Sequence, residues 1–132
     1  MNFADINYLA IIIAAIAAYA VGAAWYSFLF SKAWQAAIEV PADRMKERAS
    51  PVPFIVVGVA YLIMAFVLAG VANPQSIVGG VFAGIILWLG FVVTSTAANY
   101  AFAMRKMELT LIDSGHWLAA LVVMGAIIGA FG

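Results

Sequence analysis

Four long stretches of apolar residues run along the chain, separated by short polar segments. They cover about residues 6–30, 54–72, 76–104 and 109–131. A helix rises about 1.5 Å per residue, so about 20 apolar residues cross the roughly 30 Å hydrocarbon core of a bilayer. A membrane β-barrel would need alternating apolar and polar residues, which these runs lack. The pattern therefore predicts an all-α integral membrane protein, a four-helix bundle formed by residues 1–132 as a single domain.

Prolines and charges mark the connections between the stretches. Pro51 and Pro53 precede the second stretch, and Asn73-Pro74 forms a short turn before the third. A charged turn, Arg105-Lys106-Met107-Glu108, leads into the fourth. These breaks fall where helices are expected to end.

The long connection, residues 31–53, holds most of the charged residues. Trp34 and Ile38 lie four residues apart in it, with Gln35 and Glu39 on another face, which favours a short helix on the membrane surface. Residues 43–48 are compatible with one more helical turn. We interpret the rest of this connection as a solvated loop near the lipid headgroups.

The basic residues predict an orientation. All of them lie in the first and third connections: Lys32, Arg44, Lys46, Arg48, Arg105 and Lys106. Basic residues concentrate in cytoplasmic loops, so both connections are expected in the cytoplasm and both termini outside. Ala18-Tyr19-Ala20 imitates a signal-peptide cleavage site, but no basic residue precedes the first apolar stretch, so we expect an uncleaved helix.

The composition excludes most other classes of protein. Hydrophobic residues make up 67% of the 132, charged residues only 9%, and the mean hydropathy is +1.11. A soluble domain carries about 25% charged residues, so this chain could not cover a water-facing surface. The formal net charge is zero, so no basic surface is available for nucleic acid. The expected partners are the lipid bilayer, other membrane subunits or further copies of the chain.

Small residues recur every four positions on several of the predicted helices. In membranes such stripes allow helix backbones to approach closely. We interpret them mainly as packing surfaces within the bundle, with a specific oligomer interface as the alternative. The stripes consist of Ala14, Ala18 and Gly22; Gly80 and Gly84; Gly125 and Gly129; and, more weakly, Ala65 and Ala69.

Three helices are expected to bring polar side chains to the cytoplasmic third of the bundle. The third ends in a polar run from Thr94 to Tyr100, and the first ends in Trp25-Tyr26-Ser27. The fourth places Asp113 and His116 one turn apart on one face. Ionisable residues inside a membrane are costly, which favours a functional role. The candidate polar pocket or proton-accepting site comprises Trp25, Tyr26, Thr96, Asn99, Asp113 and His116.

The same residues have a purely structural interpretation. Asp113 could cap the fourth helix by accepting from the amides of Gly115 or His116. The polar residues of the third helix could bond to neighbouring helices, and Trp25, Tyr26 and Trp34 could form an interfacial aromatic belt. Both interpretations stay open at the level of the sequence.

No motif for specific chemistry is present. One histidine and no cysteine fall short of the usual metal-ligand sets. Nucleophile-elbow, zinc-protease, phosphate-loop and dinucleotide-binding motifs are missing from the sequence. Ser114 lies between Asp113 and His116, but adjacent helix residues project in different directions, so no catalytic triad follows. We therefore expect no metal, no cofactor and no enzymatic activity.

Several segments resemble a family of small bacterial membrane proteins, domain of unknown function 1761. Gly22 to Ser27 followed by Lys32-Ala33-Trp34 is similar to the opening signature of that family, and Thr94-Ser95-Thr96 is similar to a later segment. The last helix, with Leu111 to Gly115 leading to Val123 to Ile127, completes the likeness. The resemblance implies a four-helix protein of the bacterial inner membrane and carries no activity, substrate or cofactor with it.

Two functions are compatible with these observations. The first is a non-catalytic accessory or structural subunit that associates with a larger membrane complex or with itself, because small-residue stripes and apolar surfaces dominate the chain. The alternative is a small transporter or proton-coupled permease that uses the polar cluster at the cytoplasmic end of the bundle.

Overall fold

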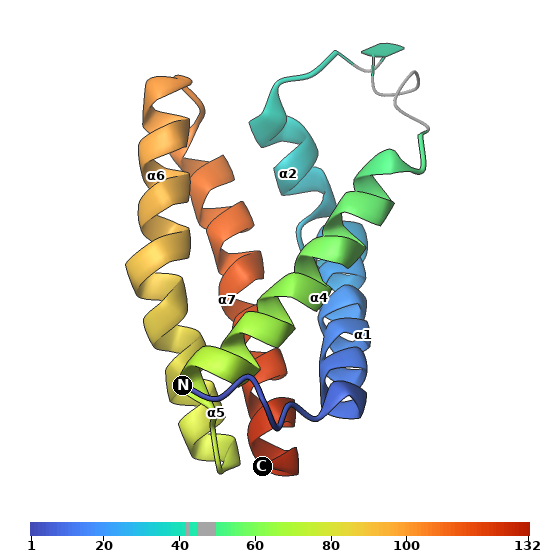
Figure 1. Ribbon diagram of the computed structural model, residues 1–132. Helices are drawn as coiled ribbons and strands as arrows, with labels where there is room; N and C mark the ends of the chain where they lie inside the picture. The colour runs from blue at the N-terminus through green and yellow to red at the C-terminus, as the bar shows by residue number, and fades with distance from the viewer. Residues whose placement is uncertain (42, 45–49) are drawn as a thin grey trace.

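The computed structural model describes residues 1–41, 43–44 and 50–132 (Figure 1). Within these ranges, four helices are long and apolar enough to cross a membrane: Tyr8–Leu29, Val52–Ala72, Ile77–Phe102 and Met107–Phe131. The described residues contain no strand. The all-α class with four membrane-length helices is therefore confirmed, and it is the pattern of a multi-pass membrane protein. Each helix begins and ends within two residues of the limits expected from the apolar pattern.

Two of the four long helices contain π-helical segments, one at the end of its helix and one in the middle. The first combines α1 (Tyr8–Ala24) with η1 (Trp25–Leu29), and the third combines α5 (Ile77–Leu87), η2 (Trp88–Val92) and α6 (Val93–Phe102). The second and fourth are the α-helices α4 (Val52–Ala72) and α7 (Met107–Phe131). A π segment widens one turn of a helix and is frequent at functional sites. The apolar pattern gave no sign of these segments.

A short helix, α2 (Ser31–Ile38), follows η1. It is the helix expected from the spacing of Trp34 and Ile38. Glu39, expected on its polar face, instead ends the helix in the left-handed conformation with φ 55°. The additional turn considered for residues 43–48 lies largely outside the described residues, as do Lys46 and Arg48.

The helices run up and down, so both chain ends lie at one end of the bundle, the terminal end (Figure 1). The start of α4 and the α6–α7 turn lie at the opposite end, the loop end. In Figure 1, α4 crosses obliquely in front of α7, and its loop-end half diverges from α6. The helix α2 lies between them at the loop end. In this view the long helices lie closer together at the terminal end than at the loop end.

The tightest packing joins α5 and α7 through glycine. A Cβ atom on Gly80 would overlap the backbone carbonyl of Gly125, and one on Gly125 would overlap that of Gly80. Gly84 faces the Leu121 carbonyl and Gly129 that of Ser76 in the same way. Ala14 and Ala18 of α1 are fully buried in the core beside Tyr61, Ala65, Leu68 and Met124. The small-residue stripes are therefore used within this chain, because only such residues let these backbones approach.

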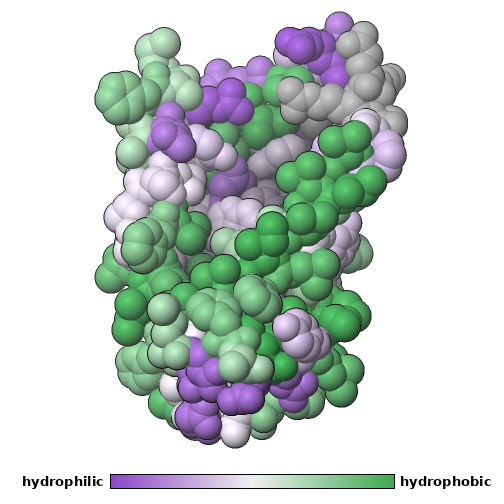
Figure 2. Space-filling model, viewed as in Figure 1, coloured by the Kyte–Doolittle hydropathy of each residue, from purple (hydrophilic) through white to green (hydrophobic). Residues whose placement is uncertain are grey.

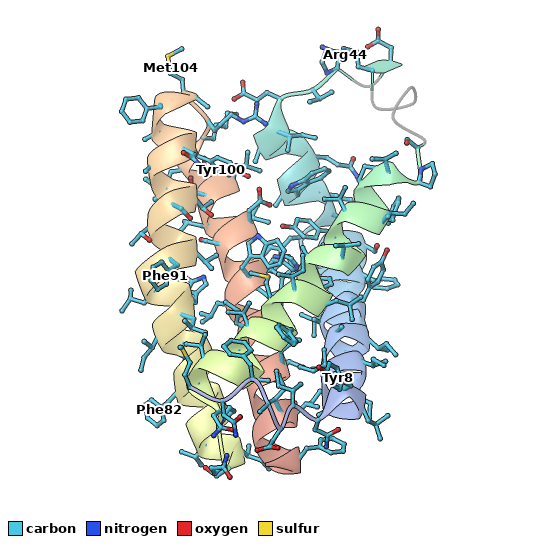
Figure 3. All side chains as sticks on the ribbon, in the orientation of Figure 1. Tyr8, Arg44, Phe82, Phe91, Tyr100 and Met104 are labelled. Carbon is cyan, nitrogen blue, oxygen red and sulfur yellow. The ribbon has the colours of Figure 1, made fainter. Side chains whose placement is uncertain are left out.

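Apolar side chains cover the middle of the molecule. Figure 2 shows hydrophobic residues across the centre of the visible face and hydrophilic residues at both ends. Many large apolar side chains are exposed there, and Phe82 points away from the bundle (Figure 3). This distribution matches a surface that faces lipid between two aqueous layers.

The terminal end is covered by the chain's first residues. The amide of Asn2 donates to the carbonyl of Gly70 at 2.8 Å. The ring of Phe3 lies over Gly70, where a Cβ atom would overlap it, and its centroid is 5.4 Å from that of Phe66. The segment before α1 is therefore anchored across the end of α4.

Substituting the α5–α7 glycines should destabilise the bundle strongly. We expect Gly80→Leu and Gly125→Leu each to lower the free energy of unfolding by about 1–3 kcal/mol or more, because the added side chain meets backbone that cannot move aside. Gly90→Leu is the matched control, since a Cβ at Gly90 has no atom within 4 Å. Unfolding in mixed detergent micelles, followed by circular dichroism, measures the difference. Equal stability of the Gly80 and Gly90 variants would contradict this account.

Candidate functional site

Each π segment begins with a tryptophan that bonds to the backbone of α7. The indole N–H of Trp25 donates to the carbonyl of Ile112 at 3.0 Å, and that of Trp88 donates to the carbonyl of Ser114 at 2.7 Å. The two acceptors flank Asp113 in the sequence. Since η1 and η2 belong to different long helices, the two indoles hold this part of α7 between them.

Hydroxyl groups satisfy the widened backbone of the third helix. Thr94 Oγ1 donates to the carbonyl of Gly90 at 3.0 Å, and Ser95 Oγ donates to those of Phe91 and Val92 at 2.5 and 3.1 Å. In a membrane such groups need partners within the protein. The hydroxyls of Thr94 and Ser95, expected to bond to neighbouring helices, bond to their own helix instead.

Asp113 is held by two tyrosines from two other helices. The hydroxyl of Tyr26 donates to Asp113 Oδ1 at 2.6 Å, and that of Tyr100 donates to Oδ2 at 2.6 Å. These lengths are typical of a hydroxyl bound to a carboxylate. Asp113 lies well inside α7, which begins at Met107, so the alternative that it caps this helix is wrong. Figure 3 shows Tyr100 projecting from α6 toward α7.

His116 lies one turn further along α7, in a buried aromatic surrounding. Its Nε2 is 2.5 Å from the hydroxyl of Tyr61, and both residues are only 2% exposed. The rings of Tyr26 and Trp117 lie 5.1 and 4.6 Å from the imidazole, centroid to centroid. Its Nδ1 is buried without a hydrogen-bond partner in the described part of the chain. A buried polar atom without a partner costs about 1–3 kcal/mol, so this position favours an additional polar contact.

Two glycines make room for these aromatic contacts. A Cβ on Gly22 would lie 2.5 Å from the Tyr61 hydroxyl and 3.2 Å from His116 Nε2. A Cβ on Gly115 would lie 3.0 Å from the indole of Trp25. Gly22 therefore lets the Tyr61–His116 pair lie against α1, and Gly115 lets Trp25 lie against α7.

A polar groove opens beside Asp113. Its volume is about 630 Å3. It lies where α4 and α6 diverge, and Figure 2 shows the hollow there with hydrophilic and intermediate residues inside it. The polar groove is lined from η1, α2, α4, α6 and α7 by residues that include Tyr26, Trp34, Phe54, Thr96, Asn99, Tyr100, Asp113 and His116. In the described residues, neither lysine nor arginine lines it.

The structure gathers most of the residues expected from the sequence. Tyr26, Thr96, Asn99, Asp113 and His116 line the polar groove. Trp25 does not line the polar groove, and its indole donates to the α7 backbone instead. Its ring and that of Tyr26 both pack in the aromatic cluster around α2.

Sequence reasoning missed Tyr61 and Trp88. Tyr61 is the one side chain with a hydrogen-bonding group in the stretch 54–72, and Trp88 is the one between Ser76 and Thr94. A lone polar group in an apolar helix needs a partner in the bundle. Their isolation in apolar stretches could have marked both residues as candidates, but it could not have identified their partners.

Gly22→Ala should disturb the Tyr61–His116 pair. We expect it to lower the free energy of unfolding by about 1–3 kcal/mol, because the methyl group overlaps the tyrosine hydroxyl. The cost should fall in a Tyr61→Phe background, where that hydroxyl is gone. A double-mutant cycle in detergent micelles measures the coupling. Gly58→Ala is the control, since its Cβ would meet Tyr19 only at 3.5 Å. An undiminished cost in the Tyr61→Phe background would contradict the prediction.

Comparison with known families supports the resemblance seen in the sequence. The model of a family described as protein of unknown function (DUF1761) matches residues 9–129. Comparisons with curated proteins and with solved structures find no match. The matched range extends from α1 to α7 and includes every residue of the candidate site. On this evidence of near-complete coverage, the chain belongs to the DUF1761 family.

Proposed function

We propose that the protein is a non-catalytic, proton-coupled permease that exchanges protons for a cationic solute at Asp113. The observation that carries the proposal is a carboxylate within a membrane-length helix, beside a groove and bound by two tyrosine hydroxyls. Family membership supplies no activity, so the proposal depends on the chemistry of this site.

The environment of Asp113 supports binding of one positive charge at a time. An acidic side chain costs on the order of 2.5–3.5 kcal/mol at the centre of a membrane helix. Asp113 lies nearer the start of α7, where the cost is smaller but still needs compensation. The hydroxyls of Tyr26 and Tyr100 compensate part of this cost, but both are neutral. A proton and a solute cation would therefore compete for the same carboxylate. Such competition at a single site couples movement of one to movement of the other.

The lining of the polar groove favours a cation over an anion. Trp34, Tyr100 and Trp117 contribute aromatic rings to it. The faces of such rings attract ammonium groups. An anionic solute would find the Asp113 carboxylate and no basic side chain among the described lining residues. Charge and ring chemistry thus favour the same class of solute.

The proposal includes the orientation that the basic residues predict. The polar groove lies at the loop end, which carries Arg105 and Lys106, and this end is placed in the cytoplasm of a bacterial inner membrane. Both termini are then outside. The polar groove would then lie in the cytoplasmic half of the bundle.

Exchange can be tested in proteoliposomes with an acidic interior and a trapped pH-sensitive dye. Adding tetramethylammonium outside should make the interior more alkaline, because this permanent cation cannot carry a proton across lipid itself. We expect Asp113→Asn to lower the rate at least about tenfold, equivalent to about 1.4 kcal/mol. His116→Ala should also lower it, by removing the imidazole beside the groove.

Phe82→Leu is the control for this experiment, because Phe82 is 61% exposed on the lipid-facing surface. Its exchange rate should equal that of the unaltered chain. Circular dichroism of every variant checks that the helices are retained. Exchange at an unchanged rate in the folded Asp113→Asn variant would exclude Asp113 as the coupling site.

An accessory role in a larger assembly stays a prediction. The glycines of α5 and α7 that favoured it contact each other inside the chain, so they supply no free surface for a partner. The third long helix nevertheless has few buried residues, with 11% of its most apolar window buried against 44% for α7. Native electrophoresis in mild detergent should show a larger species if the role is correct. Migration only as a monomer would contradict it.

A further inference from the structure

Three hollows follow one another around α4. The polar groove shares five lining residues with an inner pocket of about 190 Å3: Tyr26, Ser27, Phe54, Val57 and His116. The inner pocket is further lined by Tyr19, Gly22, Ala23 and Tyr61. Tyr19 also lines an apolar groove of about 620 Å3 between α1 and α4. The three spaces therefore adjoin, from the loop end to the lipid-facing side of the bundle.

We propose that the solute is an amphiphilic cation, a single alkyl chain with a compact ammonium head. The head occupies the polar groove at Asp113, and the chain lies in the apolar groove between α1 and α4. This inference rests on the proposed function and names the substrate class of the same site. The amphiphile reaches the site from the lipid, between α1 and α4.

The apolar groove has the chemistry of a binding site for an alkyl chain. Its lining includes Ile12, Ile16, Ile55, Val59 and Leu62, and Gly58 forms part of the α4 side. Ile12, Ile16, Val59 and Leu62 are all exposed on the surface of the bundle. Because the groove faces lipid along its length, a chain can enter it sideways without leaving an apolar medium.

The polar groove, unlike the apolar groove, contains an acidic side chain, and this favours a cationic head group. Asp113 supplies the one acidic side chain among its described lining residues. A phosphate or carboxylate head would be repelled, whereas an ammonium head is complementary in charge. Between the two grooves, the rings of Tyr19, Tyr26, Phe54 and Tyr61 line the inner pocket. Aromatic walls of this kind accept a desolvated ammonium group.

Tyr19 lies at the junction between the inner pocket and the apolar groove. Its hydroxyl donates to the carbonyl of Phe54 at 3.2 Å, and its ring meets that of Tyr61 edge-on at 6.0 Å. A Cβ on Gly58 would lie 3.5 Å from the same ring. Tyr19 thus links α1 to α4 across the path from the lipid. Rotation of this one side chain would join the two spaces.

The test compares two probes that share one head. Tetramethylammonium fits the polar groove alone, whereas decyltrimethylammonium adds the chain. Binding to the protein in lipid nanodiscs is followed by tryptophan fluorescence, below the concentration at which the longer probe forms micelles. Each probe enters the lipid equally in all samples, so only differences between variants are interpreted.

Filling the apolar groove should discriminate between the probes. Gly58→Leu and Ile16→Phe should each weaken decyltrimethylammonium binding at least about fivefold, a change of about 1 kcal/mol. Tetramethylammonium binding should change less than about twofold. Gly90→Leu is the matched control, with the same added side chain at a position without neighbours within 4 Å. Ile16 is 64% exposed, so its variant tests the inference even if Gly58→Leu fails to fold.

The outcomes separate this inference from the proposed function. If Asp113→Asn weakens both probes and groove filling affects neither, the permease stands and the alkyl-chain site is wrong. If tetramethylammonium neither binds nor exchanges, the proposed function is wrong, and the inference that rests on it is wrong as well. If Gly58→Leu converts a dimer into a monomer without changing decyltrimethylammonium binding, a second copy covers the groove and the inference is overturned.

Discussion

An acidic group inside an apolar bundle needs hydrogen-bond donors from its own chain, and Asp113 obtains them from two other helices. Tyr26 and Tyr100 reach it at 2.6 Å each. Satisfying this one carboxylate therefore fixes how η1 and α6 lie relative to α7. The indoles of Trp25 and Trp88 add two contacts to the backbone on either side. Because an unsatisfied carboxylate in lipid is costly, the arrangement of these helices around Asp113 is strongly determined.

The two ends of the bundle are held by different kinds of contact. At the terminal end, Gly80 and Gly125 bring two backbones together, and dispersion holds them. At the loop end, α4 diverges from α6, and hydrogen bonds to aromatic side chains replace close backbone packing. A groove can exist beside Asp113 because the glycine contacts already secure the other half. The closest backbone contacts and the polar groove therefore lie in different halves of the bundle.

The sequence predicted the long helices because the cost of unpaired backbone groups in lipid leaves few other solutions. It also placed Tyr26, Asp113 and His116 at one level of the bundle, because the number of residues between each of them and the nearest connection gives its depth. It did not predict that Tyr61 binds His116, because the rotation of α4 about its axis depends on packing. The π segments were missed for a similar reason: Trp88 to Val92 are as apolar as a regular helix requires.

Without its π segments, this chain would not keep the candidate site. A π turn contains one residue more than the α turn it replaces. Because that wider turn absorbs the extra residue, α6 keeps its direction relative to α5. If the same residues formed an uninterrupted α-helix, α6 would be rotated by about 100° relative to α5. Tyr100 would then leave Asp113 while the glycines of α5 kept their place on α7. The widened turn of η2 therefore allows α5 to keep its glycines on α7 while α6 keeps Tyr100 on Asp113.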